Sequence, residues 1–418
     1  MSRRTVEKQT RVAVIGGGAS GLAAAAAAAA AGAFVMVLEK EERVGRKLLA
    51  TGNGRCNYSN RYVDIKDYRS RDLDKAEKIL SRIGQKETLA FFERLGIWPR
   101  ADESGRIYPS SEQAAAVLDV LRMGLRRLGV EIFCGWPVKE LKKDPKGGFR
   151  IIGQKGEQKK ADRVIIACGG MAGAQYGCSG DGYALARAFG HQIIKPLPAL
   201  VQLSAKGDFF RHLKGVRAKG RVCLEWEGTV VAEQSGEIQF TQWGLSGICI
   251  FDLSGQAMEL LDQGKDCGIR IDLFPQIQPD AFYSRLLNRL SVSGHKSAEE
   301  FLEGMIHKKL IGVVLRACGV ESPAVPASEL GEKRIHAIAA MLKGWRIPVT
   351  GARPWSEAQI TSGGVRLSQI DPGTMESLLQ KGLYFAGEVL DAQGRCGGYN
   401  LQWAWSTGLL AGRSAAGL

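Results

Sequence analysis

The segment from Arg11 to Lys40 has no charged side chain between Val12 and Leu38, and it constrains the fold more than any other stretch. Its length could cross a bilayer, and the basic residues of "MSRR" ahead of it would suit a secretion signal. Its centre, however, is an alanine run from Ala23 to Ala31, preceded by several glycines. The residues that favour membrane insertion are concentrated at its two ends. We therefore expect a buried helix between two strands, and not a membrane span.

The two ends, "VAVI" and "FVMVL", are short apolar runs typical of buried parallel strands. Between the first run and the alanines, the glycines follow the pattern Gly16-x-Gly18-x-x-Gly21. The first glycine allows a tight exit from the strand, the second lets the backbone approach a pyrophosphate, and the third lets the helix pack closely on the sheet. The phosphates would lie at the helix N-terminus, where unpaired N–H groups and the helix dipole favour negative charge. This pattern predicts a Rossmann-like nucleotide-binding unit.

Glu39 ends the second apolar run, where a carboxylate would accept hydrogen bonds from ribose hydroxyls. An acid there argues against a 2′-phosphate, so we expect FAD or NAD and not NADP. Two further segments favour FAD. Residues 39–60 form a loop dense in glycine, Asn and basic residues, and residues 382–412 predict a strand, a glycine loop and a helix from about Asn400. A helix N-terminus directed at the flavin pyrimidine edge would stabilise negative charge on reduction.

Four motifs resemble a known group of proteins: "GGGASG" at 16–21, "GRKLLATGNGRCN" at 45–57, "ITSGGV" at 360–365 and "GGYNLQWAWSTG" at 397–408. They resemble the BaiN / aminoacetone-oxidase-like family of FAD-binding enzymes, and the resemblance runs nearly end to end. In addition, "ACGGMAG" (167–173) and "GDGYALARAFG" (180–190) are similar to segments of fumarate-reductase-type flavoproteins. One departure is the pair Arg395-Cys396 before "GGYN", where the family more often lacks a cysteine.

The resemblance implies an α/β fold in which inserted domains interrupt a Rossmann-like FAD-binding domain. We expect the FAD-binding domain at 1–195 and 356–418, a β-rich domain at 196–277 and 344–355, and a helical subdomain at 278–343. Helical periodicity at 71–95, 112–128 and 279–343 agrees with this layout. Apolar and polar residues alternate over 221–255, which predicts antiparallel strands, and further strands are expected at 163–170, 268–275 and 345–355.

The expected cofactor contacts come from the glycine turn, the acid after the second strand and the family motifs. The resemblance places Val138, which follows a predicted strand, at the adenine. The expected FAD-binding residues are Gly16, Gly18, Ala19, Ser20, Gly21, Glu39, Lys40, Arg46, Lys47, Thr51, Gly52, Asn53, Arg55, Cys56, Asn57, Val138, Gly169, Gly170, Gly363, Gly364, Gly387, Glu388, Gly398, Tyr399, Asn400 and Leu401.

Arg395 and Tyr399, which flank the glycines of the C-terminal loop, are the candidate catalytic residues. One would orient an anionic substrate and the other would donate a proton. The alternative is that Arg395 binds phosphate or solvent and that Tyr399 only packs. Cys56 is more simply an inert small residue than a redox thiol, because flavoprotein disulfide reductases carry two cysteines in this region. A Cys56–Cys396 pair stays open.

Other side chains give no metal signal. The nine cysteines include no C-x-x-C pair, and the five histidines show no ligand spacing, so we expect no metal site. Unpaired thiols in a chain of 418 residues suit a reducing cytoplasm.

These observations lead to the hypothesis of a FAD-dependent oxidoreductase that transfers hydride through flavin N5. We favour reduction of an activated C=C bond, such as the enone of a steroid- or bile-acid-like acid. The sequence leaves the electron donor open between NAD(P)H that visits the flavin transiently and a protein partner that delivers the electrons. The alternative is an amine oxidase acting on a small amine such as aminoacetone. The formal charge of +14 also allows an RNA-associated flavoprotein, but the basic residues are scattered and no RNA-binding motif accompanies them. We therefore expect a small-molecule substrate, and the positive charge of the chain is compatible with an anionic one. We expect neither a nucleic acid nor a membrane partner, and the oligomeric state stays open.

Overall fold

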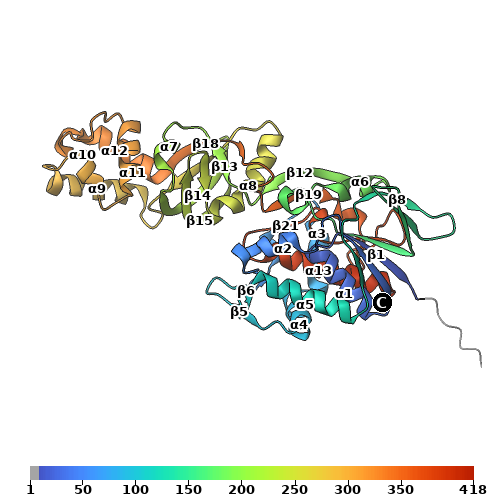
Figure 1. Ribbon diagram of the computed structural model, residues 1–418. Coiled ribbons are helices and arrows are strands. Elements are labelled where there is room, and N and C mark those ends of the chain that lie inside the picture. Colours follow the sequence, from blue (N-terminus) through green and yellow to red (C-terminus); the bar gives the residue numbers. More distant parts are fainter. Residues whose placement is uncertain (1–8) are drawn as a thin grey trace, which may run out of the picture. The chain divides into compact units, whose positions relative to one another are not determined.

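The computed structural model describes residues 9–418, which form two compact units (Figure 1). Unit 1 takes in the chain up to Leu197 together with Ile360–Leu418, and unit 2 is Pro198–Gln359. The "MSRR" segment, considered as a secretion-signal flank, lies outside the described residues. Within residues 9–418, no helix combines the length and the apolar character that crossing a membrane requires.

A five-stranded parallel sheet forms the centre of unit 1, in the order β20-β11-β1-β2-β7. The strands are β1 (Arg11–Ile15), β2 (Phe34–Leu38), β7 (Glu131–Phe133), β11 (Arg163–Ile166) and β20 (Leu383–Phe385). Because all five run in the same direction, their carboxyl ends lie along one edge of the sheet. The glycine turn after β1, Glu39 after β2, the segment from Ala167 and the segment from Ala386 therefore meet at that edge. The predicted Rossmann-like fold is confirmed.

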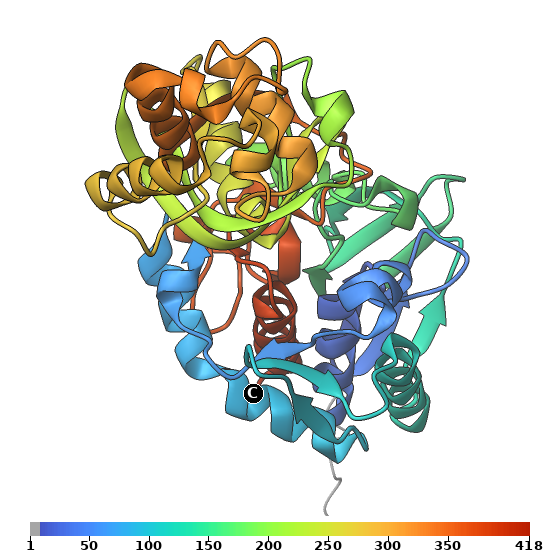
Figure 2. The same cartoon turned by 90° about the vertical axis from the view of Figure 1, so that its left-hand side faces the viewer.

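Helix α1 (Ala19–Ala30) contains most of the alanine run, and helix α13 (Tyr399–Ala416) packs along it (Figure 2). A Cβ atom on Gly408 would lie 2.4 Å from the carbonyl oxygen of Ser20, and one on Gly412 would lie 2.2 Å from that of Ala24. The two helices thus touch through their backbones, which only small side chains permit. From the first contact to the second, the contacting residue advances by one helical turn in both helices, so the helices run parallel. This close packing explains why the first helix consists of alanine.

The remaining elements of unit 1 surround this centre. Its other helices are α2 (Arg46–Ala50), α3 (Leu73–Arg82), α4 (Gln85–Arg94), α5 (Ala114–Arg127) and α6 (Asp181–Arg187). Its smaller sheets are built from β3 (Ser59–Asn60), β4 (Tyr68–Arg69), β5 (Pro99–Ala101), β6 (Arg106–Pro109), β8 (Val138–Lys143), β9 (Phe149–Gly153), β10 (Gln158–Ala161), β12 (Ile193–Ala199), β19 (Ile360–Val365) and β21 (Gln393–Gly394). The helices expected within 71–95 and 112–128 are confirmed as α3, α4 and α5.

Unit 2 contains a closed barrel with the strand order β13-β16-β15-β14-β17-β18. Its strands are β13 (Leu203–Ala205), β14 (Arg217–Trp226), β15 (Thr229–Thr241), β16 (Gly244–Ser246), β17 (Cys267–Asp272) and β18 (Trp345–Ala352), and two helices, α7 (Phe210–Leu213) and α8 (Ile248–Asp262), pack on it. The strands expected at 268–275 and 345–355 correspond to β17 and β18.

The expectation of strands throughout 221–255 is wrong from residue 248, where α8 begins. Gly247 breaks the strand with a φ of +110°, a conformation that other residues rarely adopt. Ile250, Leu253 and Ala257 then follow at helical spacing and are buried in the barrel core. The short apolar run at 248–251 fits either type of element by itself, and the barrel decides between them.

Four helices form a second hydrophobic core within unit 2. They are α9 (Pro279–Ser293), α10 (Ala298–Leu302), α11 (Lys308–Ala317) and α12 (Gly331–Gly344), as helical periodicity over 279–343 predicted. Unit 2 thus holds both the β-rich part and the helical part. Their division into two domains, and the residue boundaries expected for all three parts, stay predictions.

The packing of α13 on α1 yields a prediction about stability. Gly412→Ala should lower the free energy of unfolding by about 1–3 kcal/mol, because the new methyl group meets backbone that cannot move aside. The control is Gly312→Ala in α11, where an added Cβ meets open space, and where alanine should stabilise the helix by up to about 1 kcal/mol. Thermal unfolding followed by circular dichroism measures both. Equal shifts for the two variants would contradict the close approach of the helices.

Candidate functional site

In the glycine turn after β1, close packing requires two of the three motif glycines but not the third. A Cβ on Gly16 (φ +106°) would lie 2.5 Å from the carbonyl oxygen of Ala167, and one on Gly21 would lie 1.9 Å from that of Gly16. At Gly18, the residue before α1, a Cβ would meet nothing within 4 Å. Gly18 therefore borders open space at the N-terminus of a helix, where an anion is stabilised. The first and third glycines serve packing, and the second leaves room for a ligand.

Glu39 lies directly beside this turn. Its Oε2 accepts a hydrogen bond from the Gly17 N–H at 2.7 Å, and its Oε1 accepts one from the Glu41 N–H at 2.9 Å. The backbone of Glu39 also accepts a hydrogen bond from the Trp136 N–H at 2.9 Å, which brings the segment leading to Val138 to the same edge. The carboxylate and the open helix N-terminus thus match the ribose and pyrophosphate parts of a dinucleotide.

Two expected cofactor contacts, Lys40 and Arg46, are ion-paired within the protein. The Lys40 Nζ lies 2.6 Å from Asp181 and also donates to Ser179. Arg46 pairs with Glu41 and donates to the Gln175 carbonyl oxygen at 2.8 Å. These pairs tie the loop after β2 to the segment 175–181.

Lys47 and Glu388 form an ion pair in which Nζ and Oε2 are 2.7 Å apart. Burial is the largest influence on the pKa of Lys47 and would lower it, but the charge of Glu388, the nearby Cys178 and the hydrogen bond to Glu388 together raise the pKa, so the ammonium stays charged. The other oxygen of Glu388 accepts a hydrogen bond from the Thr361 N–H at 3.0 Å. The Thr361 hydroxyl accepts from the N–H groups of Met171 at 2.8 Å and Ala172 at 3.1 Å. Four segments far apart in the sequence thus converge on one charged centre.

Thr361 is a residue that the sequence analysis missed. It lies inside the "ITSGGV" motif, but only the two glycines of that motif were expected to matter. A Cβ on Gly170 would lie 2.2 Å from its hydroxyl oxygen, so glycine at 170 is required by Thr361 and not by a ligand. The available signal was the pair of hydroxyl residues, Thr361 and Ser362, directly ahead of the two glycines.

The other motif glycines are likewise explained by close backbone packing. A Cβ on Gly363 would lie 2.5 Å from the Lys195 carbonyl oxygen, and one on Gly364 would lie 2.6 Å from the Val389 carbonyl oxygen. A Cβ on Gly387 would lie 2.3 Å from the Ser20 hydroxyl oxygen. Ser20, in turn, donates to the carbonyl oxygen of Ala386 at 3.2 Å. Gly169 packs less tightly, with Cys178 Sγ 3.7 Å from an added Cβ.

The loop from Thr51 to Asn57 is folded largely on its own hydrogen bonds. The Thr51 hydroxyl donates to the Leu48 carbonyl oxygen at 2.6 Å, and the Cys56 N–H donates to that of Thr51 at 3.0 Å. Asn53 is exposed and adopts a left-handed conformation beside Gly52, and an added Cβ on Gly52 would lie 3.0 Å from the Asn57 backbone nitrogen.

The side chains of Arg55 and Cys56 turn to different surroundings. The Arg55 guanidinium lies 4.7 Å from the centre of the Tyr108 ring and 3.9 Å from Glu112, on the exposed surface. Cys56 is fully buried, and burial raises its pKa to about 12. None of the nine cysteines forms a disulfide, so the Cys56–Cys396 pair left open by the sequence is not formed.

A set of contacts, called the clip below, joins the C-terminal glycine loop to the segment around β4. Strand β21 pairs with β4, Arg395 lies 3.3 Å from Asp67, and the Tyr68 hydroxyl donates to the Tyr399 carbonyl oxygen at 2.8 Å. The side chain of Asn400 exchanges hydrogen bonds with Gly394 at 2.7 and 2.8 Å. A Cβ on Gly398 (φ +100°) would lie 2.3 Å from the Ser59 carbonyl oxygen. The clip holds the start of α13, including Leu401, in place, and it buries Tyr399.

The two helices α1 and α13 present their N-termini at the same edge of the sheet. Because Gly408 faces Ser20 and the helices run parallel, α13 begins about 12 Å further out than α1, at 1.5 Å per residue. Two helix N-termini staggered in this way suit a long ligand that carries negative charge at two points. Among the described residues 9–418, no group of three or more His, Cys, Asp or Glu side chains is arranged to hold a metal ion.

Comparison with known proteins places the whole chain in context. The sequence model of the family described as HI0933-like protein Rossmann domain matches residues 10–414. A 3-dehydro-bile acid delta(4,6)-reductase of Clostridium scindens is 42% identical over 97% of this chain and 99% of its own length. A ribosomal RNA dihydrouridine synthase of Escherichia coli is 29% identical over 94% of this chain and 95% of its own. A solved 3-ketosteroid delta1-dehydrogenase of Sterolibacterium denitrificans shares the fold, with a TM-score of 0.50 at 14% identity over 98% of this chain and all of the other.

The buried thiols give a prediction about reactivity. Because their pKa values are raised to about 12, Cys56 and Cys168 should not react with a disulfide reagent such as DTNB at pH 8 in the folded protein. Fast labelling should come mainly from the exposed Cys134 and be lost in Cys134→Ser. In guanidinium chloride all nine thiols should react. Fast labelling that persists in Cys134→Ser and disappears in Cys56→Ser would instead indicate a reactive thiol at Cys56.

Proposed function

Because the chain belongs to the HI0933-like family, we propose that it is a FAD-dependent oxidoreductase that reduces a C=C bond conjugated to a carbonyl group. The observation that carries this proposal is the end-to-end similarity, at 42% identity, to a 3-dehydro-bile acid delta(4,6)-reductase. The substrate proposed here is therefore an enone of a steroid- or bile-acid-like acid. Bound FAD would supply the hydride from N5 of its isoalloxazine ring.

The residues of unit 1 suit each part of FAD in turn. The pyrophosphate would lie against Gly18, Ala19 and Ser20 at the start of α1, and the ribose against Glu39. The adenine would lie near Val138. The isoalloxazine would extend toward the start of α13, whose N-terminus favours the negative charge that the ring acquires on reduction.

The charged centre and the clip would shape the flavin end of this site. Lys47 and Glu388 neutralise one another, so the pair can border the cofactor without leaving an uncompensated buried charge. Tyr399 is proposed as the proton donor and Arg395 as the group that orients an acidic substrate. The clip holds both residues, with Arg395 beside Asp67 and the Tyr399 backbone bonded to Tyr68. NAD(P)H is the proposed electron donor. We also propose a cytoplasmic location, which nine cysteines without a disulfide would fit.

The open space at Gly18 gives a test of cofactor binding. Gly18→Ala should fold normally, because the methyl group meets no protein atom, but it should weaken FAD binding about tenfold or more by displacing the pyrophosphate. Titration of the apoprotein with FAD, followed by quenching of flavin fluorescence, measures the change. Gly312→Ala is the matched control, because Gly312 also has open space beside it and no positive φ, and it should bind FAD as the wild type does. Unchanged affinity in Gly18→Ala would place the pyrophosphate elsewhere.

The reaction itself is tested with photoreduced protein under nitrogen. A 3-oxo-4,6-diene bile acid should reoxidise the flavin and lose the absorbance of its extended dienone, with one double bond saturated per flavin oxidised. Air should reoxidise the flavin slowly by comparison. Fast oxidation by air together with hydrogen peroxide formed in the presence of aminoacetone would contradict the reductase and support the amine oxidase.

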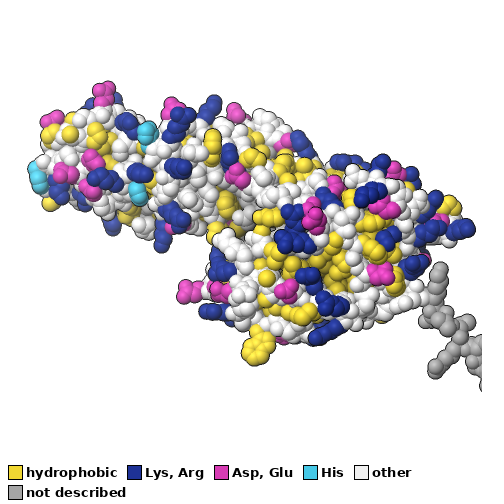
Figure 3. Space-filling model, viewed as in Figure 1, with side chains coloured by type: hydrophobic (Ala, Val, Ile, Leu, Met, Phe, Trp, Pro, Cys, Tyr) yellow, Lys and Arg dark blue, Asp and Glu magenta, His cyan; other side chains and the backbone are white. Residues whose placement is uncertain are grey.

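A second candidate function, reduction of uridine in ribosomal RNA, is favoured by the similarity to a ribosomal RNA dihydrouridine synthase. Unit 2 contains 19 Lys and Arg against 18 Asp and Glu, so nearly all of the +14 charge belongs to unit 1. On the face shown in Figure 3, however, basic side chains are interspersed with neutral and acidic ones. The same photoreduced protein, offered a ribosomal RNA transcript, distinguishes the two. Reoxidation by the RNA and not by the enone would favour the RNA-modifying function.

A further inference from the structure

Two segments of unit 1 border the glycine turn after β1, because β2 and β11 are the neighbours of β1 in the sheet. The loop after β2 reaches the turn where the Gly45 N–H donates to the Gly17 carbonyl oxygen at 2.9 Å. The segment after β11 reaches it at Gly16, where an added Cβ would lie 2.5 Å from the Ala167 carbonyl oxygen. Both segments start at the carboxyl ends of parallel strands, where folds of this kind bind dinucleotides.

Three side-chain contacts, called the strap below, join these two segments to each other. The Lys40 Nζ lies 2.6 Å from the Asp181 Oδ2 and also donates to the Ser179 hydroxyl. The Arg46 guanidinium donates to the Gln175 carbonyl oxygen at 2.8 Å. Both basic residues belong to the chain that follows β2, and their partners belong to the chain that follows β11. The strap therefore crosses from one border of the glycine turn to the other.

The strap completes a closed path of contacts that runs from the glycine turn through both segments and back. The two segments are also close at Lys47, whose Cε lies 3.7 Å from an added Cβ on Gly173. Gly18 belongs to the same turn, and an added Cβ there meets no atom within 4 Å. A pyrophosphate held at Gly18 would therefore lie between the two segments that the strap joins.

The strap can open while the rest of unit 1 stays folded. Its five residues, Lys40, Arg46, Gln175, Ser179 and Asp181, are all exposed or half-buried. The side chains of Lys40 and Asp181 are 28% and 46% exposed. Ion pairs at such positions are weak, because water and salt screen the two charges. Breaking these contacts therefore requires no rearrangement of a buried side chain.

We propose that the strap retains the cofactor, so that FAD leaves only after Lys40 and Arg46 release the segment 175–181. The inference rests on the proposed FAD site and concerns how long the cofactor stays there. Lys40 and Asp181 are positioning residues, since they hold together the two segments that border the pyrophosphate. This role differs from the direct cofactor contact that the sequence predicted for Lys40 and Arg46, because protein groups already engage both side chains.

Two single substitutions distinguish the strap from a direct attraction between Lys40 and the phosphates of FAD. Lys40→Gln removes a positive charge, and Asp181→Asn removes a negative one. Because each breaks the same ion pair, the strap predicts that both speed FAD release about threefold. A direct attraction predicts effects of opposite sign, because the loss of a negative charge near the anion would slow its release.

Release is measured on holoprotein diluted far below its dissociation constant, as the rise in fluorescence of the freed flavin. The variant that combines Lys40→Gln with Asp181→Asn should release FAD no faster than Lys40→Gln alone, since the two residues share one contact. Added salt should speed release from the wild type more than from this double variant. The melting temperatures of the apoproteins should be equal, because both side chains lie at the surface.

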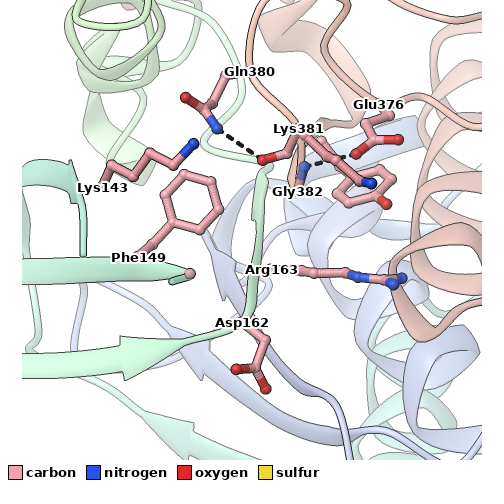
Figure 4. Close-up of a pocket in the computed structure, with 10 residues that line it drawn as sticks. Lys143, Phe149, Asp162, Arg163, Glu376, Gln380, Lys381 and Gly382 are labelled. Carbon is pink, nitrogen blue, oxygen red and sulfur yellow. Dashed lines mark hydrogen bonds between the residues drawn. The ribbon is translucent and has the colours of Figure 1, made fainter. Parts of the chain in front are cut away.

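The control is Lys142→Gln, which breaks another exposed ion pair, in which the Lys142 Nζ lies 2.5 Å from Glu140. The next residue of β8, Lys143, lines a pocket of about 310 Å³ together with Arg163, the first residue of β11 (Figure 4). The control pair is thus near the amino end of β11, and the glycine turn is at the carboxyl edge of the sheet. Lys142→Gln should therefore release FAD as the wild type does.

The results separate the strap from the FAD site on which it rests. A wild type that binds no FAD would overturn both. Where the wild type binds FAD, unchanged release in Lys40→Gln, slower release in Asp181→Asn, or equally accelerated release in Lys142→Gln would overturn the strap and leave the FAD site standing.

Discussion

Helices α1 and α13 touch through their backbones, and this contact fixes where the two helix N-termini lie at the candidate site. Gly408 and Gly412 lie directly against the carbonyl oxygens of Ser20 and Ala24. Gly21 lies equally close to Gly16, so α1 is fixed against both the sheet and α13. A larger side chain at any of these places would push the helices apart by ångströms, because packed interiors have little room to yield. The stagger of the two helix N-termini is thereby built into the fold.

The charged centre formed by Lys47 and Glu388 links segments that the chain separates by hundreds of residues. Glu388 follows β20, Lys47 lies in the first turn of α2, and Thr361 lies in β19, where the chain returns to unit 1. A partly buried ion pair adds little net stability by itself, since desolvation offsets the attraction. Its contribution is geometric, because removal of either partner would leave a charge without its counter-charge beside the glycine turn. The same holds for Arg395 and Asp67 at the start of α13.

Several site residues are explained by packing where the sequence analysis expected ligand contact. Gly170, Gly363, Gly364 and Gly387 each face protein atoms at distances that no Cβ could tolerate. A glycine in a motif therefore indicates that some group lies very close to the backbone at that position. The sequence does not reveal whether that group belongs to a cofactor or to another strand. Gly18 differs from these four glycines, because no atom of residues 9–418 lies within 4 Å of an added Cβ there. The same ambiguity affected residues 248–255, where an apolar run suited both strand and helix.

The sequence by itself determined the first strand, the glycine turn, the alanine helix and the acid after the second strand, because these features are local and each has a single physical explanation. It also determined the helices of 279–343, whose periodicity is long enough to be unambiguous. Only the tertiary structure decided that Thr361 joins Lys47 and Glu388, that Cys56 and Cys396 form no disulfide, and that α8 is a helix. These outcomes depend on contacts between segments that are distant in the sequence. A local pattern of residues does not determine them, because it carries no information about which distant segment packs against it.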